Sequence, residues 1–295
     1  MQSKYKYAGM CAAIVLAGWA LRSPAEQLPL EPAHESGQSI TGAFEGWFSN
    51  PDGSYSLLMG YYNRNQKQDL DIPVGPNNRI EPGGPDQGQP THFLAGRQWG
   101  IFTIHEPKDF NGKRLTWTIV ANGKTTQIPL DVDTLWEVSP FIEASGNTPP
   151  YIGFSENGPF VNGPTGTSES VTATTGTPLP LTVWVADDAK LPAGSPKPRT
   201  PAVSVTFTMY RGPASVTFSA ARPKVEEVKF KGPEGTVFTG KATTEATFSE
   251  PGDYTLNVQG NDWSGEGGRG FQCCWSNAKV KVSVSGMPVH TGGAQ

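Results

Sequence analysis

The residues of this chain best suited to bind a ligand lie in two long loops of its second half, 187–201 and 261–275. Their carboxylate and amide oxygens are hard ligands that suit Ca²⁺, and their tryptophans offer apolar contact area. The competing interpretation is that the carboxylates only accept backbone hydrogen bonds in turns, because no EF-hand or other spaced ligand motif is present. The candidate binding residues are Asp187, Asp188, Asn261, Asp262, Trp263 and Trp275.

The second loop also contains two adjacent cysteines, Cys273 and Cys274. In a straight strand their side chains would point to opposite faces. Either the backbone kinks to form a vicinal disulfide, or one thiol packs while the other is exposed. An exported free thiol is liable to oxidise, which favours the disulfide.

No catalytic motif stands out in the sequence. Ser276 and Lys279 have the S-x-x-K spacing of a serine nucleophile, but they lie at the start of an expected strand instead of on a helix. The sequence has no G-x-S-x-G, P-loop or dinucleotide fingerprint. We therefore expect a protein that is not an enzyme. A secreted hydrolase with its site in the turn-rich segment 75–98 remains an alternative.

The first 25 residues have the pattern of a cleaved signal peptide. Lys4 and Lys6 precede a short apolar run, and small residues flank possible cleavage points after Ala20 and Ala25. The apolar run is too short for a stable membrane span. Cleavage after Ala25 would leave 20 basic and 27 acidic residues, a net charge of −7 with His neutral. Such a charge argues against nucleic acid as a partner. The signal peptide predicts a secreted or periplasmic protein, and we expect its partner to be a protein or a glycan.

Alternation of apolar and polar residues predicts strands along most of the remaining chain. The clearest case is 243–263, where two alternating runs flank the corner Pro251-Gly252. Tyr254, just past this corner, is placed like the tyrosine corner of immunoglobulin-type sandwiches. In the first half, Asn122-Gly123 between two alternating runs predicts a two-residue hairpin turn.

These patterns predict an all-β protein with two immunoglobulin-like β-sandwich domains in tandem. In the last strand, Lys279 and Lys281 are expected to face water and to discourage edge-to-edge pairing. The expected segments are a signal peptide at 1–25, a flexible lead-in at 26–39, a first sandwich at 40–138, a linker at 139–146, a second sandwich at 147–286 and a tail at 287–295.

The second half of the chain resembles a known family. The segments that carry the resemblance are NTPPYIGF, PLPLTVWVADD, VTFTMYRGPASVTF, TTEATFSEPGDYTLNVQGND and KVKVSV. They are similar to bacterial immunoglobulin-like domains of the polycystic-kidney-disease type, over about half of the chain. The resemblance implies a spacer and adhesion module of exported proteins that has no catalytic residues. In an immunoglobulin topology, the two long loops would meet at one end and could form a recognition site.

Five aromatic residues of the first half offer another kind of site. They could form a sugar-stacking platform, although their alternation fits a buried core better. We therefore expect an exported, non-catalytic binding, adhesion or spacer protein, with carbohydrate binding through these aromatics as an alternative. The five residues are Trp47, Tyr55, Tyr61, Tyr62 and Trp99.

Overall fold

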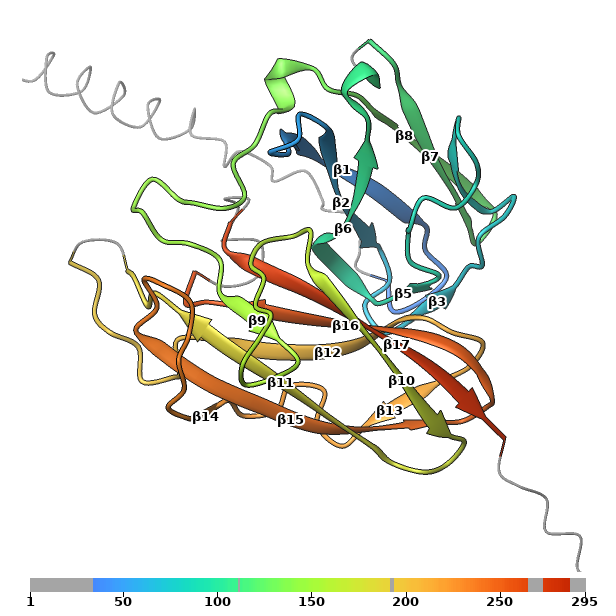
Figure 1. Ribbon diagram of the computed structural model, residues 1–295. Helices are drawn as coiled ribbons and strands as arrows, with labels where there is room; N and C mark the ends of the chain where they lie inside the picture. Colours follow the sequence, from blue (N-terminus) through green and yellow to red (C-terminus); the bar gives the residue numbers. More distant parts are fainter. Residues whose placement is uncertain (1–33, 111, 192–193, 265–272, 287–295) are drawn as a thin grey trace, which may run out of the picture. The chain divides into compact units, whose positions relative to one another are not determined.

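The computed structural model describes residues 34–110, 112–191, 194–264 and 273–286, shown in Figure 1. They belong to one compact unit that begins at His34 and contains two β-sandwiches. The expected signal peptide and the expected tail lie outside the described residues. No helix in the described part of the chain is long and apolar enough to cross a membrane.

The first sandwich consists of two antiparallel three-stranded sheets. One has the strand order β1 (Ile40–Ser49), β2 (Tyr55–Asn63), β6 (Gly96–Glu106). The other has the order β4 (Asn78–Glu81), β7 (Leu115–Ala121), β8 (Lys124–Leu130). Smaller elements are β3 (Leu70–Asp71), β5 (His92–Phe93) and the 3-10 helices η1 (Lys108–Phe110) and η2 (Thr134–Trp136).

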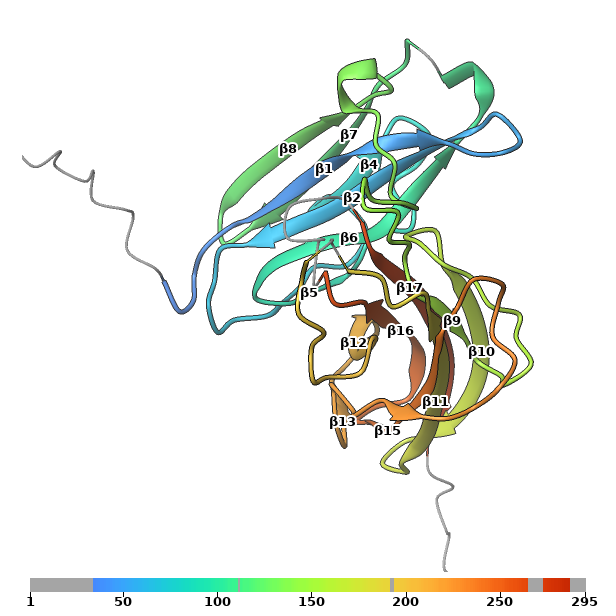
Figure 2. The same cartoon turned by 90° about the vertical axis from the view of Figure 1, so that its left-hand side faces the viewer.

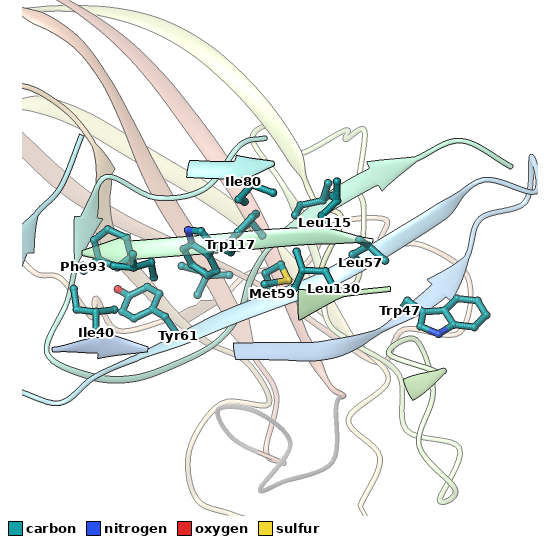
Figure 3. Packing of buried hydrophobic residues seen from close by; sticks show 14 of the residues in the cluster. Ile40, Trp47, Leu57, Met59, Tyr61, Ile80, Phe93, Leu115, Trp117 and Leu130 are labelled. Carbon is teal, nitrogen blue, oxygen red and sulfur yellow. The ribbon is translucent and has the colours of Figure 1, made fainter. Parts of the chain in front are cut away.

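The core of the first sandwich lies between these sheets. Figure 3 shows Leu57 and Met59 of β2 facing Leu115 and Trp117 of β7. All four side chains are buried, because alternate residues of a strand share one face. Trp117 also donates its indole N–H to the buried Asn78 Oδ1, at 3.0 Å, so its polar edge is satisfied inside the core.

The predicted Asn-Gly turn is confirmed. Asn122 and Gly123 have φ values of 47° and 74°, and β7 pairs with β8 immediately on either side of them. Positive φ at both central residues is the requirement of the type I′ turn that matches the twist of a hairpin. By contrast, the lead-in is not wholly flexible, because His34 forms a bridge with Asn65 and Gln38 N–H donates to Asn65 Oδ1.

The second sandwich also has two sheets, which enclose its core (Figure 2). One has the order β10 (Thr167–Thr174), β17 (Trp275–Ser285), β16 (Gly252–Asn261), β12 (Ser204–Arg211). The other has the order β13 (Val216–Phe218), β15 (Phe238–Phe248), β11 (Leu179–Asp187), β9 (Tyr151–Gly153), with β14 (Glu226–Glu227) also on β15. The prediction of an all-β protein with two immunoglobulin-like sandwiches is therefore confirmed.

The tyrosine corner is confirmed as well. The Tyr254 hydroxyl donates to the Glu250 carbonyl at 2.9 Å, across the Pro251-Gly252 reversal. Phe248 before the corner and Leu256 after it are both fully buried, as the alternation predicted. The corner thereby ties together two strands that belong to different sheets, β15 and β16.

Two expectations for the last strand are wrong. β17 is not an edge, because β10 pairs with it in parallel on one side and β16 on the other. β10 is a half-exposed strand with few apolar residues, so its sequence carries little alternation. Lys279 does not face water: its Nζ donates to Ile101 O at 2.9 Å and to Asn257 Oδ1 at 2.6 Å. Lys281 is exposed, as expected.

The two sandwiches are joined by the outer face of β17. Alternate residues on this face bind backbone carbonyls of β6 in the first sandwich. Asn277 Nδ2 donates to Gly100 O at 2.6 Å, and the Lys279 ammonium binds the next carbonyl, Ile101 O. The Lys279 ammonium also lies 3.7 Å from the ring centroid of Tyr210, which packs in the core of the first sandwich. This junction consists largely of polar side chains that are satisfied by backbone oxygens.

Candidate functional site

The structure brings Asp187 and Asp262 to one end of the second sandwich. Asp187 ends β11 and continues the inward row that contains Val185. Asp262 follows β16 and continues the inward row that contains Val258. Both carboxyl groups are buried, with exposed fractions of 1% for Asp187 and 6% for Asp262. Because alternate residues share a face, both side chains enter the space between the two sheets, beyond the last apolar residues.

The three predicted carboxylates accept the hydrogen bonds of turns. Asp187 Oδ1 accepts from Ala189 N–H at 2.8 Å, and Asp262 Oδ1 accepts from Ser264 N–H at 2.8 Å. Asp188 behaves in the same way, accepting from the amide two residues on. The three carboxylates therefore stabilise turns, and the expectation that they bind Ca²⁺ stays a prediction. Within the described ranges, no three Asp, Glu, His or Cys side chains group closely enough to hold a metal by themselves.

Sequence reasoning missed one member of this end of the sandwich, Asn147. Its Nδ2 donates to Asp262 Oδ2 at 2.5 Å, and its side chain is buried. The neighbouring Thr148 donates both its N–H and its hydroxyl to Asp188 Oδ2. The segment before β9 therefore connects the two long loops. The signal available in the sequence was a pair of polar residues directly before Pro149-Pro150, where a new strand begins.

Burial dominates the electrostatics of this region. It raises the pKa of Asp187 to about 8, and the nearby Asp262 and Asp188 carboxylates add to the effect. Burial also raises the pKa of Asp262, against the hydrogen bonds from Ser264 and Asn147 that favour the ionised form. Asp187 Oδ2 and Asn147 Oδ1 are buried without a hydrogen-bond partner among the described residues. The end of the sandwich is therefore rich in oxygen acceptors and short of donors.

The two long loops also form a groove, which we call the tip groove. The indole N–H of Trp263 in one loop donates to Thr200 O in the other at 3.2 Å, so the loops meet as predicted. The groove has a volume of about 660 Å³. Val237 on its wall is 72% exposed. Its main lining side chains are Lys197, Arg199, Lys224, Val237, Phe238 and Trp263.

The tip groove favours an anion. Lys197, Arg199 and Lys224 are exposed and form no ion pair within the described part of the chain. The carboxylates of the groove lie on β14, and they pair with lysines outside it, as Glu227 does with Lys229 at 2.9 Å. Lys197 also acts electrostatically on Glu227. Three cations and an aromatic ring thus line one groove, which suits a ligand with negative charge and a flat apolar face.

The remaining predicted residues lie elsewhere. Trp275 is buried at the junction, where its indole N–H donates to Gly100 O at 3.3 Å, so it does not contribute contact area at the tip. Asn261 is buried, and its Nδ2 donates to Gln259 Oε1 on the outer face of β16. The vicinal disulfide between Cys273 and Cys274 is present, and both residues are buried.

The five aromatic residues of the first sandwich differ in burial. Trp47 and Tyr61 are buried in the core, which confirms the competing interpretation for them. Tyr62 is 44% exposed, and Trp99 lies under the Arg97 guanidinium, 3.9 Å from the ring centroid. Tyr55 is partly buried and packs against the core, as its alternation with neighbouring residues suggested.

A different set of exposed apolar residues follows the strands of the first sandwich. We call it the apolar ridge. The segment that bears it lies against β1, where Val138 N–H donates to Trp47 O. The signal in the sequence was a run of large apolar residues in the stretch where the strand pattern lapses. The ridge consists of Leu135, Trp136, Phe141 and Ile142, exposed by 86%, 54%, 37% and 54%.

The segment 75–98 serves to dock the first sandwich on the second. Arg211 of β12 pairs with Asp86 at 2.8 Å, and the Tyr210 hydroxyl donates to Gly88 O. Glu81, the other carboxylate of this segment, pairs with Arg79. Both carboxylates of this segment therefore pair with arginines.

No protein-family model and no curated protein sequence matches this chain. Among solved structures, the D00-D0 domain of Intimin is similar over 83% of this chain and 99% of its own, with 11% identity and a TM-score of 0.25. The CFA/I enterotoxigenic E. coli adhesin CfaE is similar over 88% and 81%, with 9% identity and a TM-score of 0.25. A PapD-like domain of human CEP192 is similar over 50% and 93%, with 10% identity and a TM-score of 0.28. Likenesses this low carry no argument about function.

Proposed function

We propose that this chain is an exported, non-catalytic binding protein that holds an acidic glycan in the tip groove. The observation that carries the proposal is the contact between Trp263 and Thr200, which places the indole in a groove that Lys197, Arg199 and Lys224 also line. A pyranose ring can lie against the indole, while its carboxylate or sulfate group binds Lys197, Arg199 or Lys224.

The rest of the chain supports a binding role outside the cytoplasm. The N-terminal pattern of an export signal and the buried Cys273–Cys274 disulfide both fit an oxidising compartment. A relationship of the second half to domains of the polycystic-kidney-disease type, which its sequence segments resemble, would also fit an adhesion or spacer module. In this proposal the first sandwich is fixed to the second by the junction at β17.

Calorimetric titration with uronic-acid oligosaccharides and with neutral cello-oligosaccharides tests the proposal. We expect binding of the acidic oligosaccharides alone. Trp263→Ala, and the triple change of Lys197, Arg199 and Lys224 to Ala, should each weaken it by at least about tenfold, because stacking and charge-assisted contacts are lost. A matched control replaces three exposed lysines of the first sandwich, Lys108, Lys113 and Lys124. Equal loss in the control, or no binding by the parent, contradicts the proposal.

The apolar ridge favours a second candidate function, contact with a partner protein. Exposed apolar patches of this kind mark interaction surfaces. The ridge is flanked by Asp133, Glu137 and Glu143, and the sequence between Asp131 and Glu143 contains no Lys or Arg. A partner would therefore offer an apolar surface with a basic rim, and a second copy of this chain would be repelled.

A further inference from the structure

Three buried side-chain oxygens of the second sandwich lack a hydrogen-bond partner among the described residues, and one of them, Asn261 Oδ1, lies on the outer face of β16. The other two belong to residues at the end of the core. Asp187 Oδ2 and Asn147 Oδ1 are without a hydrogen-bond partner among the described residues. The exposed fractions of the two residues are 1% and 3%. A buried acceptor left without a donor costs free energy, and native proteins satisfy such atoms with a water or an ion.

Both residues lie at the same end of the sandwich, because Asn147 contacts Asp262 and the Asp262 carboxylate acts electrostatically on Asp187. The Asn147 side chain is directed there because its own Nδ2 donates to Asp262 Oδ2. The Asp187 side chain is directed there because it continues the inward row of β11, with Val185 directly before it in that row. Asp262 enters from the opposite sheet. Three residues from three separate segments therefore present oxygen atoms to the end of the core.

The charge around this space is strongly negative. Asp187, Asp188 and Asp262 lie there, and Glu143 is close enough to act on Asp262. Lys190 is the one cation that bonds to this set within the described ranges, with its Nζ 3.4 Å from Asp188 Oδ2 and half exposed to solvent. Four carboxylates against one ammonium leave a net charge of −3 when all are ionised. A bound cation would offset this charge and satisfy the unpartnered oxygens together.

We propose that a divalent cation of the Ca²⁺ class binds between Asp187 Oδ2, Asn147 Oδ1 and the Asp262 carboxylate. The ligands are all oxygens, and two of them are carboxylates, which suits a hard cation of charge +2. Ca²⁺ accepts six to eight oxygens in flexible geometry, so backbone carbonyls and water can complete its shell. The cation would connect β11, β16 and the segment before β9, beneath the two loops of the tip groove. The cation site does not depend on the glycan, because it lies between the sheets and not in the groove.

Thermal unfolding of the full chain, first stripped with EDTA, tests the site. We expect CaCl₂ to raise Tm by roughly 5 °C or more once its concentration exceeds Kd about 100-fold. Asp187→Asn and Asp262→Asn each keep an oxygen that can accept the turn hydrogen bond, so these variants should fold. They should lose most of the Ca²⁺ response, because each removes one negative ligand. Asp133→Asn is the matched control, since Asp133 also accepts a turn amide but lies beside η2.

A direct binding measurement removes the dependence on stability. Tb³⁺ substitutes for Ca²⁺ and should show luminescence excited through Trp263, the residue next to Asp262. CaCl₂ should displace it, and Asp187→Asn should weaken Tb³⁺ binding at least tenfold. A protonated Asp187 or a bound water would satisfy the same oxygens without a metal. In that case Tm would not respond to 10 mM CaCl₂, or would respond equally in Asp187→Asn and the parent, and the proposal would be wrong.

Discussion

Trp275 lies so close to Gly100 that a Cβ atom on Gly100 would fall 2.0 Å from Trp275 Cζ2. Gly100 has a φ of +47°, and its carbonyl accepts the indole N–H of Trp275. The two residues belong to different sandwiches, β6 of the first and β17 of the second. The absence of a side chain at Gly100 is therefore what allows the strands to approach.

Gly100→Ala should consequently destabilise the protein by about 1–3 kcal/mol, the usual cost of inserting atoms into a packed site. Gly96→Ala is the matched control, because Gly96 on the same strand has a φ of +80° and a Cβ atom added there would meet nothing within 4 Å. The control carries the cost of the backbone conformation without the steric overlap. Denaturant midpoints of the two variants should differ, and equal midpoints would mean that Trp275 moves aside freely.

Tyr254→Phe should lower the free energy of unfolding by on the order of 1 kcal/mol, since it removes the hydrogen bond to Glu250 O. Tyr151→Phe serves as the control, because the Tyr151 hydroxyl has no partner in the described part of the chain. Urea unfolding measures both. If Tyr254→Phe has the midpoint of the parent, the corner does not depend on the hydroxyl.

The lowered pKa of Lys279 should make stability rise with pH in the alkaline range. Burial, with the Arg211 charge adding to it, lowers the pKa of Lys279 from 10.5 to about 7. Between these two values the unfolded chain binds a proton that the folded chain has lost, so stability increases as pH rises from about 7 to 10.5. Lys279→Met should remove this component, whereas Lys281→Met, on the exposed side of β17, should retain it. Parallel pH profiles for the parent and Lys279→Met would refute the assignment.

Asp187 should make stability fall as pH rises, in protein that EDTA keeps free of divalent cations. Burial raises its pKa from 3.8 to about 8, so the folded chain holds a proton that the unfolded chain loses. The stability due to this proton is complete below pH 3.8 and is lost as pH rises towards 8. Asp187→Asn should flatten the decline, and the difference in unfolding free energy should grow from about pH 5 to about pH 8. A constant difference would show that Asp187 is ionised throughout.

Leu135→Ser should leave stability within about 0.5 kcal/mol of the parent, because Leu135 is 86% exposed. The same change should shorten retention on a hydrophobic-interaction column, since the apolar ridge loses its most exposed member. Leu130→Ser provides the contrast, because Leu130 is fully buried and its replacement should destabilise the first sandwich strongly. A large loss of stability in Leu135→Ser would mean that the ridge packs against the chain itself.

Local patterns in the sequence were enough to predict the sandwiches. The alternation around Phe248 and Leu256, the Asn122-Gly123 turn and the Tyr254 corner each depend on residues within one short stretch of sequence. Period-2 alternation reports that one face of a strand is covered, and turn chemistry reports where the chain reverses. Both properties are set by neighbours in sequence, so they can be recognised without the fold.

Only the tertiary structure decided which distant residues contact the covered faces of the strands. Trp275 was expected at the tip and Lys279 in water, yet both bind backbone carbonyls of a strand more than 170 residues away in sequence. Asn147 joins Asp262 across 115 residues, with nothing in either local sequence to pair them. The sequence around an Asn or Lys looks the same whether its side chain binds water or a distant carbonyl. Residue type fixes which hydrogen bonds the side chain can form, and the fold decides which partner it meets.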